Sequence, residues 1–387
     1  MSEWKKVKLR DCCLKIGSGS TPKGGSTVYV ESGTSFIRSQ NVYNLSFDYN
    51  GLTHITEDAA NKLNGVTIFN DDILLNITGD SVARTCIVPN DVLPARVNQH
   101  VAIVRADCKM INSRFLNYYL ASPGMQAHML SLAVGKGASR NAMTKQMIEN
   151  FEVPCPSLST QHHIATILSR YDSLIENYQK QIKLLEEAAQ RLYKEWFVDL
   201  NFPGHENTKI VDGVPEGWKK KKVGEITPIK TGKKDANFGT VDGSYPFFTC
   251  SQEPIKAPSY SFDTSAVILA GNGDFNVKLY RGKFEAYQRT YVLEPTNEKM
   301  LYLLYFCISE NMNRLATGAS GSTIKFLTKG MIESLVINKP STIVLDSFNQ
   351  IIEPIRTQKE NLQTQIRLLT EARDRLLPKL MSGEIKA

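Results

Sequence analysis

The chain has 387 residues, 42% of them hydrophobic and 22% charged, a composition typical of a globular protein with room for two domains. We find no run of about 18 uncharged apolar residues and no apolar segment behind the charged start, so we expect a cytoplasmic protein without a transmembrane helix or secretory signal. The seven cysteines are scattered without metal-ligand spacing, which argues against a disulfide framework or a zinc site.

The net charge of +7 is concentrated in two segments of the chain. Residues 1–156 carry 16 basic and 13 acidic side chains, and residues 218–340 carry 17 basic and 11 acidic ones. The stretches between and after these segments are nearly balanced or acidic. A positive balance in both segments favours contact with nucleic-acid phosphates.

The first positive segment has the pattern of a mixed α+β domain. Short apolar or alternating runs predict strands at 35–38, 72–77 and 101–104. A helix is predicted at 113–120, and a Gly-rich loop follows at 135–141.

A long helix is predicted next in the chain. No Pro or Gly occurs from Gln161 to Phe197, and apolar residues recur at steps of three and four, which indicates one apolar stripe. An acidic linker then occupies residues 198–217.

The second positive segment repeats this plan and ends in a second arm. Strands are predicted at 266–270 and 290–293, a helix at 300–306 and a Gly-rich loop at 318–323. The second arm has apolar residues on a 4-3 rhythm from Phe348 to Leu380, interrupted by Lys359 and Arg373. We expect Pro354 to kink this helix or delay its start, and Pro378 with Gly383 to close it.

The period near 3.5 residues in the second arm predicts helix pairing in a coiled coil. Two helices of matched length in one chain have each other as the obvious partner, in antiparallel orientation. The alternative is that each arm packs only on its own globular part. Residues predicted at the helix interface are Leu174, Tyr178, Ile182, Leu185, Leu192, Leu362, Ile366, Leu369 and Leu376.

The two halves of the chain are copies of one module. Landmarks between 144 and 192 recur 184 residues later without a gap: Thr144-Lys145-x-Met147-Ile148-Glu149 returns as Thr328-Lys329-x-Met331-Ile332-Glu333, and Gln181-Ile182-Lys183-Leu184-Leu185 returns as Gln365-Ile366-Arg367-Leu368-Leu369. Repeats of this length are too long for a solenoid. The chain is therefore predicted to have approximate two-fold symmetry.

Several sequence motifs of the chain resemble those of the specificity subunits of type I restriction-modification systems. They are Pro156-x-Leu158-x-x-Gln161-x-x-Ile164-Ala165 at the first helix entry, Lys194-Glu195-Trp196-Phe197-Val198-Asp199 with Phe202-Pro203-Gly204 after that helix, Val214-Pro215-Glu216-Gly217-Trp218 at the start of the second copy, and Leu377-Pro378-Lys379-Leu380-Met381-Ser382-Gly383-Glu384-Ile385 near the C-terminus. The second copy departs from this pattern at its helix entry, where Ile343-Val344-Leu345-Asp346 stands.

The resemblance implies an internally duplicated α+β fold. Two globular α/β target-recognition domains, at 1–156 and 218–341, would be joined by two long antiparallel α-helices, at 157–197 and 342–387, which form a coiled-coil spacer. Residues 198–217 would link the first helix to the second domain.

The same resemblance implies a non-catalytic reader of a bipartite, asymmetric site in double-stranded DNA. Two adenine-N6 methyltransferase chains and two motor-nuclease chains would be its partners, and S-adenosylmethionine, ATP and Mg would be bound by those partners. The chain contains no cofactor loop or Asn/Asp-Pro-Pro-aromatic loop of an adenine methyltransferase. The alternative function is a coiled-coil scaffold of a DNA-defence complex that reads no sequence itself.

Residues that contact DNA should be long donors or amides on loops, because Arg reads guanine and Asn or Gln reads adenine in the major groove. In the first copy the candidates are Arg38, Asn41, Asp80, Arg84, Asn98, Gln99, Lys136, Ser139, Arg140 and Asn141. In the second copy they are Asn272, Asp274, Tyr287, Gln288, Arg289, Ser320, Ser322 and Lys325, with Lys230, Lys233 and Lys234 as phosphate contacts. The alternative for each is an ordinary solvated loop residue.

Overall fold

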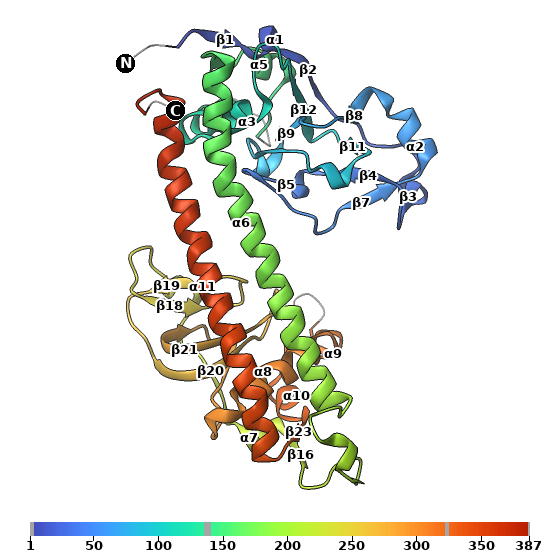
Figure 1. Ribbon diagram of the computed structural model, residues 1–387, viewed down its shortest axis with the longest axis vertical. Coiled ribbons are helices and arrows are strands. Elements are labelled where there is room, and N and C mark those ends of the chain that lie inside the picture. The colour runs from blue at the N-terminus through green and yellow to red at the C-terminus, as the bar shows by residue number, and fades with distance from the viewer. Residues whose placement is uncertain (1–3, 135–140, 322–324, 386–387) are drawn as a thin grey trace. The chain divides into compact units, whose positions relative to one another are not determined.

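The computed structural model describes residues 4–134, 141–321 and 325–385. The chain divides into two compact units (Figure 1): unit 1 comprises residues 1–179 and 364–387, and unit 2 comprises residues 180–363. The long helices α6 (Leu158–Tyr193) and α11 (Thr342–Met381) each contribute a segment to both units. In the described ranges, no helix is long and apolar enough to cross a membrane.

Unit 1 contains two β-sheets. The first is antiparallel, in the order β10 (Thr85–Ile87), β9 (Ile73–Asn76), β12 (Val101–Ala106) and β2 (Cys13–Ser18). The second has the order β3 (Tyr29–Val30), β7 (Thr53–Ile55), β4 (Thr34–Ile37), β11 (Ala95–Val97) and β8 (Thr67–Ile68), with β4 and β11 parallel.

The central strand β9 is buried on both faces, which explains its unbroken apolar sequence. Ile73 and Leu75 point into the core that contains the helices, whereas Leu74 packs with Ile37 and Val97 of the second sheet. Because side chains alternate across a strand, these two environments cover its two faces.

Short helices and strand pairs complete unit 1. The helices are α1 (Leu9–Cys12), α2 (Glu57–Lys62), α3 (Ser113–Ala121), α4 (Pro123–Ala133) and α5 (Lys145–Glu149). The pairs are β1 (Lys6–Lys8) with β13 (Glu152–Pro154) and β5 (Val42–Tyr43) with β6 (Ser46–Phe47). The side-chain oxygen of Asn112 caps α3 by accepting a bond from the Phe115 amide at 3.0 Å.

Unit 2 is built on one mixed sheet with the order β17 (Ile229–Thr231), β22 (Thr290–Leu293), β20 (Phe262–Ala270), β21 (Val277–Ala286), β18 (Tyr245–Phe248) and β19 (Ile255–Ala257). Its short helices are α7 (Val223–Ile226), α8 (Leu301–Glu310), α9 (Met312–Gly318) and α10 (Lys329–Glu333). Two strand pairs lie outside this sheet, β14 (Ile210–Val211) with β15 (Val214–Pro215) and β16 (Lys219–Lys222) with β23 (Val336–Lys339).

The duplication read from the sequence is present in the topology. The strand order β10-β9-β12-β2 of unit 1 recurs in unit 2 as β21-β20-β22-β17, with antiparallel pairing throughout. The copies differ beyond these strands. Unit 2 extends its sheet through a parallel pairing of β18 with β21, whereas unit 1 carries a separate five-stranded sheet. The duplicated α+β fold is therefore confirmed, with a shared core and divergent additions.

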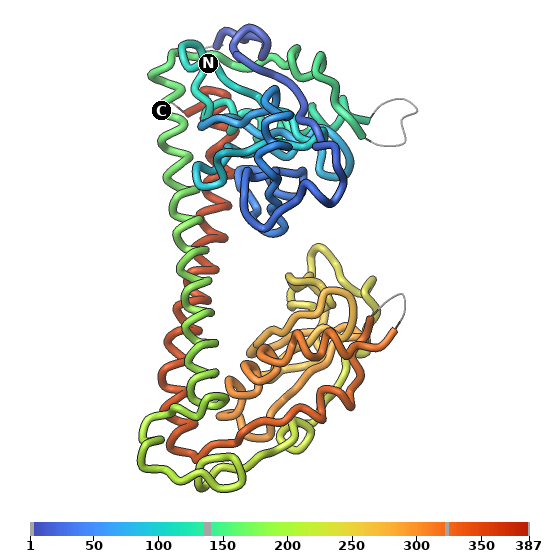
Figure 2. Tube along the Cα trace, turned by 90° about the vertical axis from the view of Figure 1, so that its right-hand side faces the viewer, coloured from blue at the N-terminus to red at the C-terminus, as the bar shows by residue number. Residues whose placement is uncertain are grey.

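The two long helices pair with each other within each unit (Figure 2). In unit 1, Asp172 of α6 forms an ion pair with Arg373 of α11. Leu168, which precedes Asp172 in α6, shares a core cluster with Leu377, which follows Arg373 in α11. The helices are therefore antiparallel there. The alternative in which each arm packs only on its own globular part is wrong.

Unit 2 shows the same antiparallel pairing at the other ends of the helices. Glu186 forms an ion pair with Lys359. Trp196, which follows Glu186 in the chain, contacts Phe348, which precedes Lys359, with ring centroids 5.9 Å apart. Trp196, Phe197 and Phe348 belong to one apolar cluster with the sheet and with α8.

Most residues predicted at the helix interface are covered. Leu362 is buried, and Tyr178, Ile182, Leu185, Leu192, Ile366, Leu369 and Leu376 are half-buried. Leu174 is a wrong prediction, because its side chain is 41% exposed while that of Ile175 is 9% exposed. The apolar rhythm of α6 passes from Tyr171 through Ile175 to Tyr178, and Leu174 lies beside that stripe.

The two prolines of the second arm, Pro354 and Pro378, do not mark the start or the end of the helix, contrary to expectation. α11 begins at Thr342, so Pro354 does not delay its start, and it continues through Pro378 to Met381. A proline removes one helical hydrogen bond. Buried contacts on both sides of Pro354, at Ile352 and Leu362, offset that loss. Gly383, with a φ of +71°, lies beyond the helix end as expected.

Candidate functional site

In unit 1, three loops are joined at the end of β9 and the start of β12. The Ile77 amide donates to the His100 carbonyl at 2.9 Å, and the Met143 amide donates to the Ile77 carbonyl at 2.8 Å. The Gly79 amide donates to the Asn141 carbonyl at 2.9 Å. These bonds place Thr78, Asp80, Gln99, His100 and Asn141 in one group, which we call the unit 1 loop cluster.

In unit 2, the same place in the fold holds a second group. The Gly271 amide donates to the Arg289 carbonyl at 2.8 Å, and the Leu327 amide donates to the Gly271 carbonyl at 2.8 Å. Ser320 and Phe326 exchange two backbone hydrogen bonds, at 3.0 and 2.8 Å. We call Asn272, Asp274, Gln288, Arg289, Ser320 and Phe326 the unit 2 loop cluster.

The two clusters share one backbone design. Ile77 and Gly271 make the same pair of hydrogen bonds, and Thr78 and Asn272 make isolated bridges to Ala142 and Phe326, which lie 184 residues apart. Gly79 and Gly273 follow with φ of +75° and +68°, a conformation that glycine adopts at little cost. By this alignment Asp80 corresponds to Asp274, Gln99 to Gln288 and His100 to Arg289.

A glycine in each copy brings a further segment against the cluster. An added Cβ would lie 2.1 Å from the Val97 carbonyl oxygen at Gly19 and 2.0 Å from the Ala286 carbonyl oxygen at Gly232. The approach lets Thr21 hydrogen-bond to Gln99, and it lets the Gln288 amide donate to the Lys234 carbonyl at 2.9 Å. Lys233 and Lys234 therefore adjoin the unit 2 loop cluster, as phosphate contacts would.

Side chains of the unit 2 loop cluster border a small polar cavity. Its volume is about 320 Å³, and it is lined by Gly271, Gln288, Arg289, Tyr291, Phe326 and Leu327. The Gln288 amide group donates to Asp235 at 2.9 Å, and Phe326 is 36% exposed. An exposed arginine, an amide and an aromatic ring are the groups that read base edges and contact thymine methyls.

Two predicted DNA contacts are corrected by the structure. Asn41 is fully buried, where its amide donates to the Asp48 carbonyl at 2.9 Å and its oxygen accepts from the Arg38 amide at 3.0 Å. Asn98 is buried and accepts from the His100 amide at 3.1 Å. Both asparagines shape loops from within, because short amides compete well for nearby backbone groups.

Other predicted contacts are divided between exposed and half-buried positions. Arg38 donates to the Gly51 carbonyl at 2.8 Å, and the Arg84 guanidinium lies over the Tyr43 ring at 4.5 Å, so both have protein partners. The exposed residues are Asp80, Gln99, Lys230, Lys233, Asp274, Gln288, Arg289, Ser320 and Lys325, and the half-buried residues are Arg38, Arg84, Asn141, Lys234, Asn272 and Tyr287. Lys136, Ser139, Arg140 and Ser322 lie outside the described residues.

Lys230 is the predicted phosphate contact whose charge is already compensated. Its ammonium lies 2.9 Å from a Glu294 carboxylate oxygen, and Thr264 donates to the other oxygen at 2.7 Å. Hydrogen bonds from Thr264 and Lys230 lower the pKa of Glu294 below its ordinary value, so the carboxylate stays charged. Lys230 is therefore a weaker candidate than Lys233 and Lys234.

Sequence reasoning missed four members of this site: Thr21, Thr78, His100 and Phe326. The Thr78 hydroxyl lies 2.6 Å from the His100 ring. Thr78 and His100 could have been found through the duplication, because they align with the predicted Asn272 and Arg289, whereas Phe326 aligns with Ala142, which is not a predicted contact. Thr21 carries no such signal, since tertiary contacts alone bring it to the loops.

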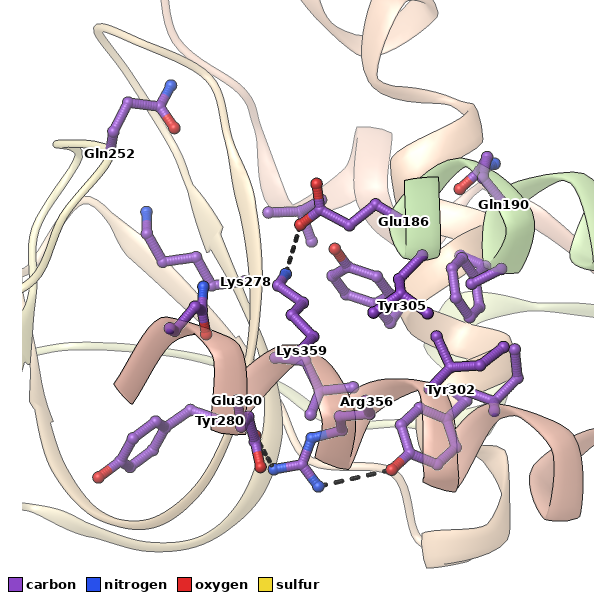
Figure 3. Close-up of a pocket in the computed structure, with 18 of the residues that line it drawn as sticks. Glu186, Gln190, Gln252, Lys278, Tyr280, Tyr302, Tyr305, Arg356, Lys359 and Glu360 are labelled. Atoms are coloured by element: carbon purple, nitrogen blue, oxygen red, sulfur yellow. Dashed lines mark hydrogen bonds and ion pairs between the residues drawn. The ribbon is translucent and has the colours of Figure 1, made fainter. Parts of the chain in front are cut away.

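A larger cavity of about 700 Å³ lies in unit 2 between the helix pair, β21 and α8 (Figure 3). It is lined by charged and aromatic side chains, including Lys278, Tyr280, Tyr305, Arg356 and Lys359. Burial lowers the pKa of Lys278. Within the described ranges, no group of three or more His, Cys, Asp or Glu residues could hold a metal ion.

Comparison with known proteins agrees with this arrangement. The family model described as type I restriction modification DNA specificity domain matches residues 1–187 and 215–364. The EcoDI type I restriction enzyme specificity subunit of Escherichia coli is 39% identical over 176 residues, 44% of this chain and 39% of that subunit. The MjaIX specificity subunit of Methanocaldococcus jannaschii is 25% identical over 414 aligned residues, covering 99% of this chain and 94% of that subunit.

The fold also has a counterpart among solved structures. The S subunit of a type I restriction-modification system from M. genitalium matches with a TM-score of 0.60 over 97% of this chain and 96% of that one. The sequence identity is 16%, so this likeness concerns the fold.

Proposed function

This chain belongs to the family of type I restriction-modification DNA specificity subunits, and we propose that it reads a bipartite, asymmetric DNA site through its two loop clusters. The observation that carries the proposal is the recurrence of one backbone design with different side chains. His100 corresponds to Arg289, Thr78 to Asn272, and Ala142 to Phe326. Two clusters of equal geometry and unequal chemistry suit two half-sites of different sequence.

The positive charge of the two globular parts supports this proposal. Phosphate contacts supply sequence-independent affinity and set the register, while loop side chains supply the choice of base. Lys233 and Lys234 adjoin the base-reading candidates Gln288 and Arg289. Backbone-directed and base-directed groups thus lie together, as an interface of this kind requires.

We further propose that the paired helices set the gap between the half-sites. A 36-residue helix such as α6 is about 54 Å long at a rise of about 1.5 Å per residue. A turn of DNA is about 34–36 Å, so a spacer of this length suits half-sites about one to one and a half turns apart. In this proposal the helix length determines the gap and the loops determine the bases.

Catalysis is assigned to partner subunits in this proposal. Two adenine-N6 methyltransferase subunits would act at the sites that this chain selects, and two motor-nuclease subunits would cleave unmodified DNA. S-adenosylmethionine, ATP and Mg would be bound by those subunits. The scaffold alternative, with no sequence reading, is not favoured by any contact in the loop clusters.

Mapping methylated adenines tests the assignment of the clusters. In cells that supply the methyltransferase subunit, Arg289→Ala should relax recognition at one base pair of the unit 2 half-site, at about 1–3 kcal/mol for a lost bidentate contact. The other half-site should be unchanged. Arg314→Ala, which removes another exposed arginine of unit 2 outside the cluster, is the control and should leave the map as it was. Equal relaxation of both half-sites by Arg289→Ala would contradict the proposal.

A further inference from the structure

Among the residues that the structure describes, each unit has one ion pair that crosses between the paired helices. In unit 1, the Arg373 guanidinium of α11 lies 2.7 Å from an Asp172 oxygen of α6, and these side chains are 13% and 18% exposed. The other Asp172 oxygen accepts a hydrogen bond from Tyr118. Burial alone would lower the pKa of Arg373, but the contacts with Asp172 and Asp374 raise it above the ordinary value.

In unit 2, Lys359 of α11 lies 2.5 Å from a Glu186 oxygen of α6 (Figure 3), with exposures of 29% and 51%. Lys359 and Arg373 are the residues that interrupt the apolar rhythm of α11. In both units, therefore, α6 supplies the acid and α11 supplies the base. Solvent weakens the more exposed pair, so the Asp172–Arg373 pair should dominate.

The duplication shows what each helix would meet if it paired with a copy of itself. In the second copy, 184 residues later, the counterpart of Asp172 is Arg356 and the counterpart of Glu186 is Thr370. In the observed register, two α11 helices from different molecules would thus place Arg373 against Arg356. Two α6 helices would place Asp172 against Ala189, the counterpart of Arg373.

Arg356 could not replace Asp172 as the partner of Arg373 in such a pairing. It is already engaged on its own helix, 2.5 Å from Glu360 and 3.6 Å from Glu353, and Glu353 is shared with Arg281 at 2.8 Å. Both carboxylates are already paired, so Arg373 would lose Asp172 and gain no free acid in a partly buried interface. A charge that is desolvated without a partner opposes association.

We propose that Asp172 and Arg373, supported by Glu186 and Lys359, form a charge code that directs α6 to pair with α11 and opposes pairing of α11 with α11. This inference goes beyond DNA reading and does not depend on it. Similar apolar stripes do not by themselves distinguish α6 from α11, so charged positions at the interface can add that distinction. Buried polar groups at single positions of a helix interface select partners and register in this way.

The test uses the full chain and two single reversals that break the same ion pair. Arg373→Asp puts two acids together within the chain, but in an α11–α11 pairing it places the new carboxylate against Arg356, an attractive contact. Asp172→Arg puts two bases together within the chain and still leaves Arg373 without an acid in an α11–α11 pairing. A role in stability alone predicts equal behaviour of the two variants, whereas the charge code predicts different behaviour.

Sedimentation velocity over a concentration series gives the readout, with co-purification of two differently tagged copies. We expect Arg373→Asp to strengthen self-association by about tenfold or more over the native chain, while Asp172→Arg does not. The double variant Asp172→Arg/Arg373→Asp restores an attractive pair within the chain and should return to native behaviour. Equal self-association of the two single variants, or no rescue in the double variant, would overturn the proposal.

Discussion

At the residue scale, one glycine in each unit allows a loop segment to pass close to the backbone of a neighbouring strand. Gly232 allows the segment before Lys233 to pass the Ala286 carbonyl, and Gly19 has the same role beside Val97. Neither position is marked by a positive φ, so the requirement comes from the neighbouring strand. The sequence therefore shows that a glycine is present but does not show the close backbone contact that requires it.

Replacing Gly232 with Ala should therefore destabilise unit 2. The new methyl would lie 2.0 Å from a backbone oxygen that cannot rotate away, and we expect a loss of about 1–3 kcal/mol in the free energy of unfolding. Chemical denaturation measures this loss. Gly330→Ala, where no atom lies within 4 Å of the added Cβ, is the matched control. Equal stability of the two variants would show that the close approach is not required.

Lys233 and Lys234 carry the second residue-scale prediction. If both contact phosphates, the double replacement by Ala should weaken binding to all sequences alike and reduce the slope of log affinity against log salt by about two. Lys230→Ala should change that slope little, because Glu294 already neutralises Lys230. Binding titrations of the assembled complex at several salt concentrations decide this. A loss confined to particular sequences would assign the two lysines to base reading instead.

At the element scale, the sequence predicted regular elements well and loop contacts poorly. The predicted strand 290–293 coincides with β22, and the long helix begins and ends within a few residues of its apolar stripe. Both depend on local periodicity. Asn41 and Asn98 were misjudged because a loop asparagine has the same sequence signal whether it faces solvent or ties a turn from within. The expected delay of the helix start at Pro354 was wrong, because packing along α11 outweighs the local preference of proline.

The helix interface gives the element-scale prediction. Replacing Leu185 and Leu369 with Asp puts an unpaired carboxylate into the helix interface of each unit, which is costly, so we expect the helices to separate and methylation to be lost. Leu184→Asp with Leu368→Asp is the control at duplicated leucines that are 64% and 51% exposed, and it should leave the helix pairing intact. Circular dichroism melting and methylation mapping follow both effects. Methylation with an unchanged gap in the Leu185/Leu369 variant would show that helix pairing does not set the spacing.

At the scale of the whole molecule, duplication would account for the proposed reading of two different sequences by one chain. The strand order and the loop hydrogen bonds are common to both units, which keeps the two clusters alike in geometry. The additions differ, with a separate sheet in unit 1 and an extended sheet in unit 2. If each unit reads one half-site, selection can change the bases read by one unit while the other unit and the helix pair are retained.

The most direct test of this account is a genome-wide map of methylated adenines in cells that express this chain with its methyltransferase subunit. The account predicts one motif of two specified, unequal half-sites separated by a gap of fixed length and free sequence. Inserting one helical turn into both α6 and α11 should lengthen the gap and leave the bases unchanged. A contiguous motif, two identical half-sites, or a helix variant that changes the bases instead of the gap would contradict it.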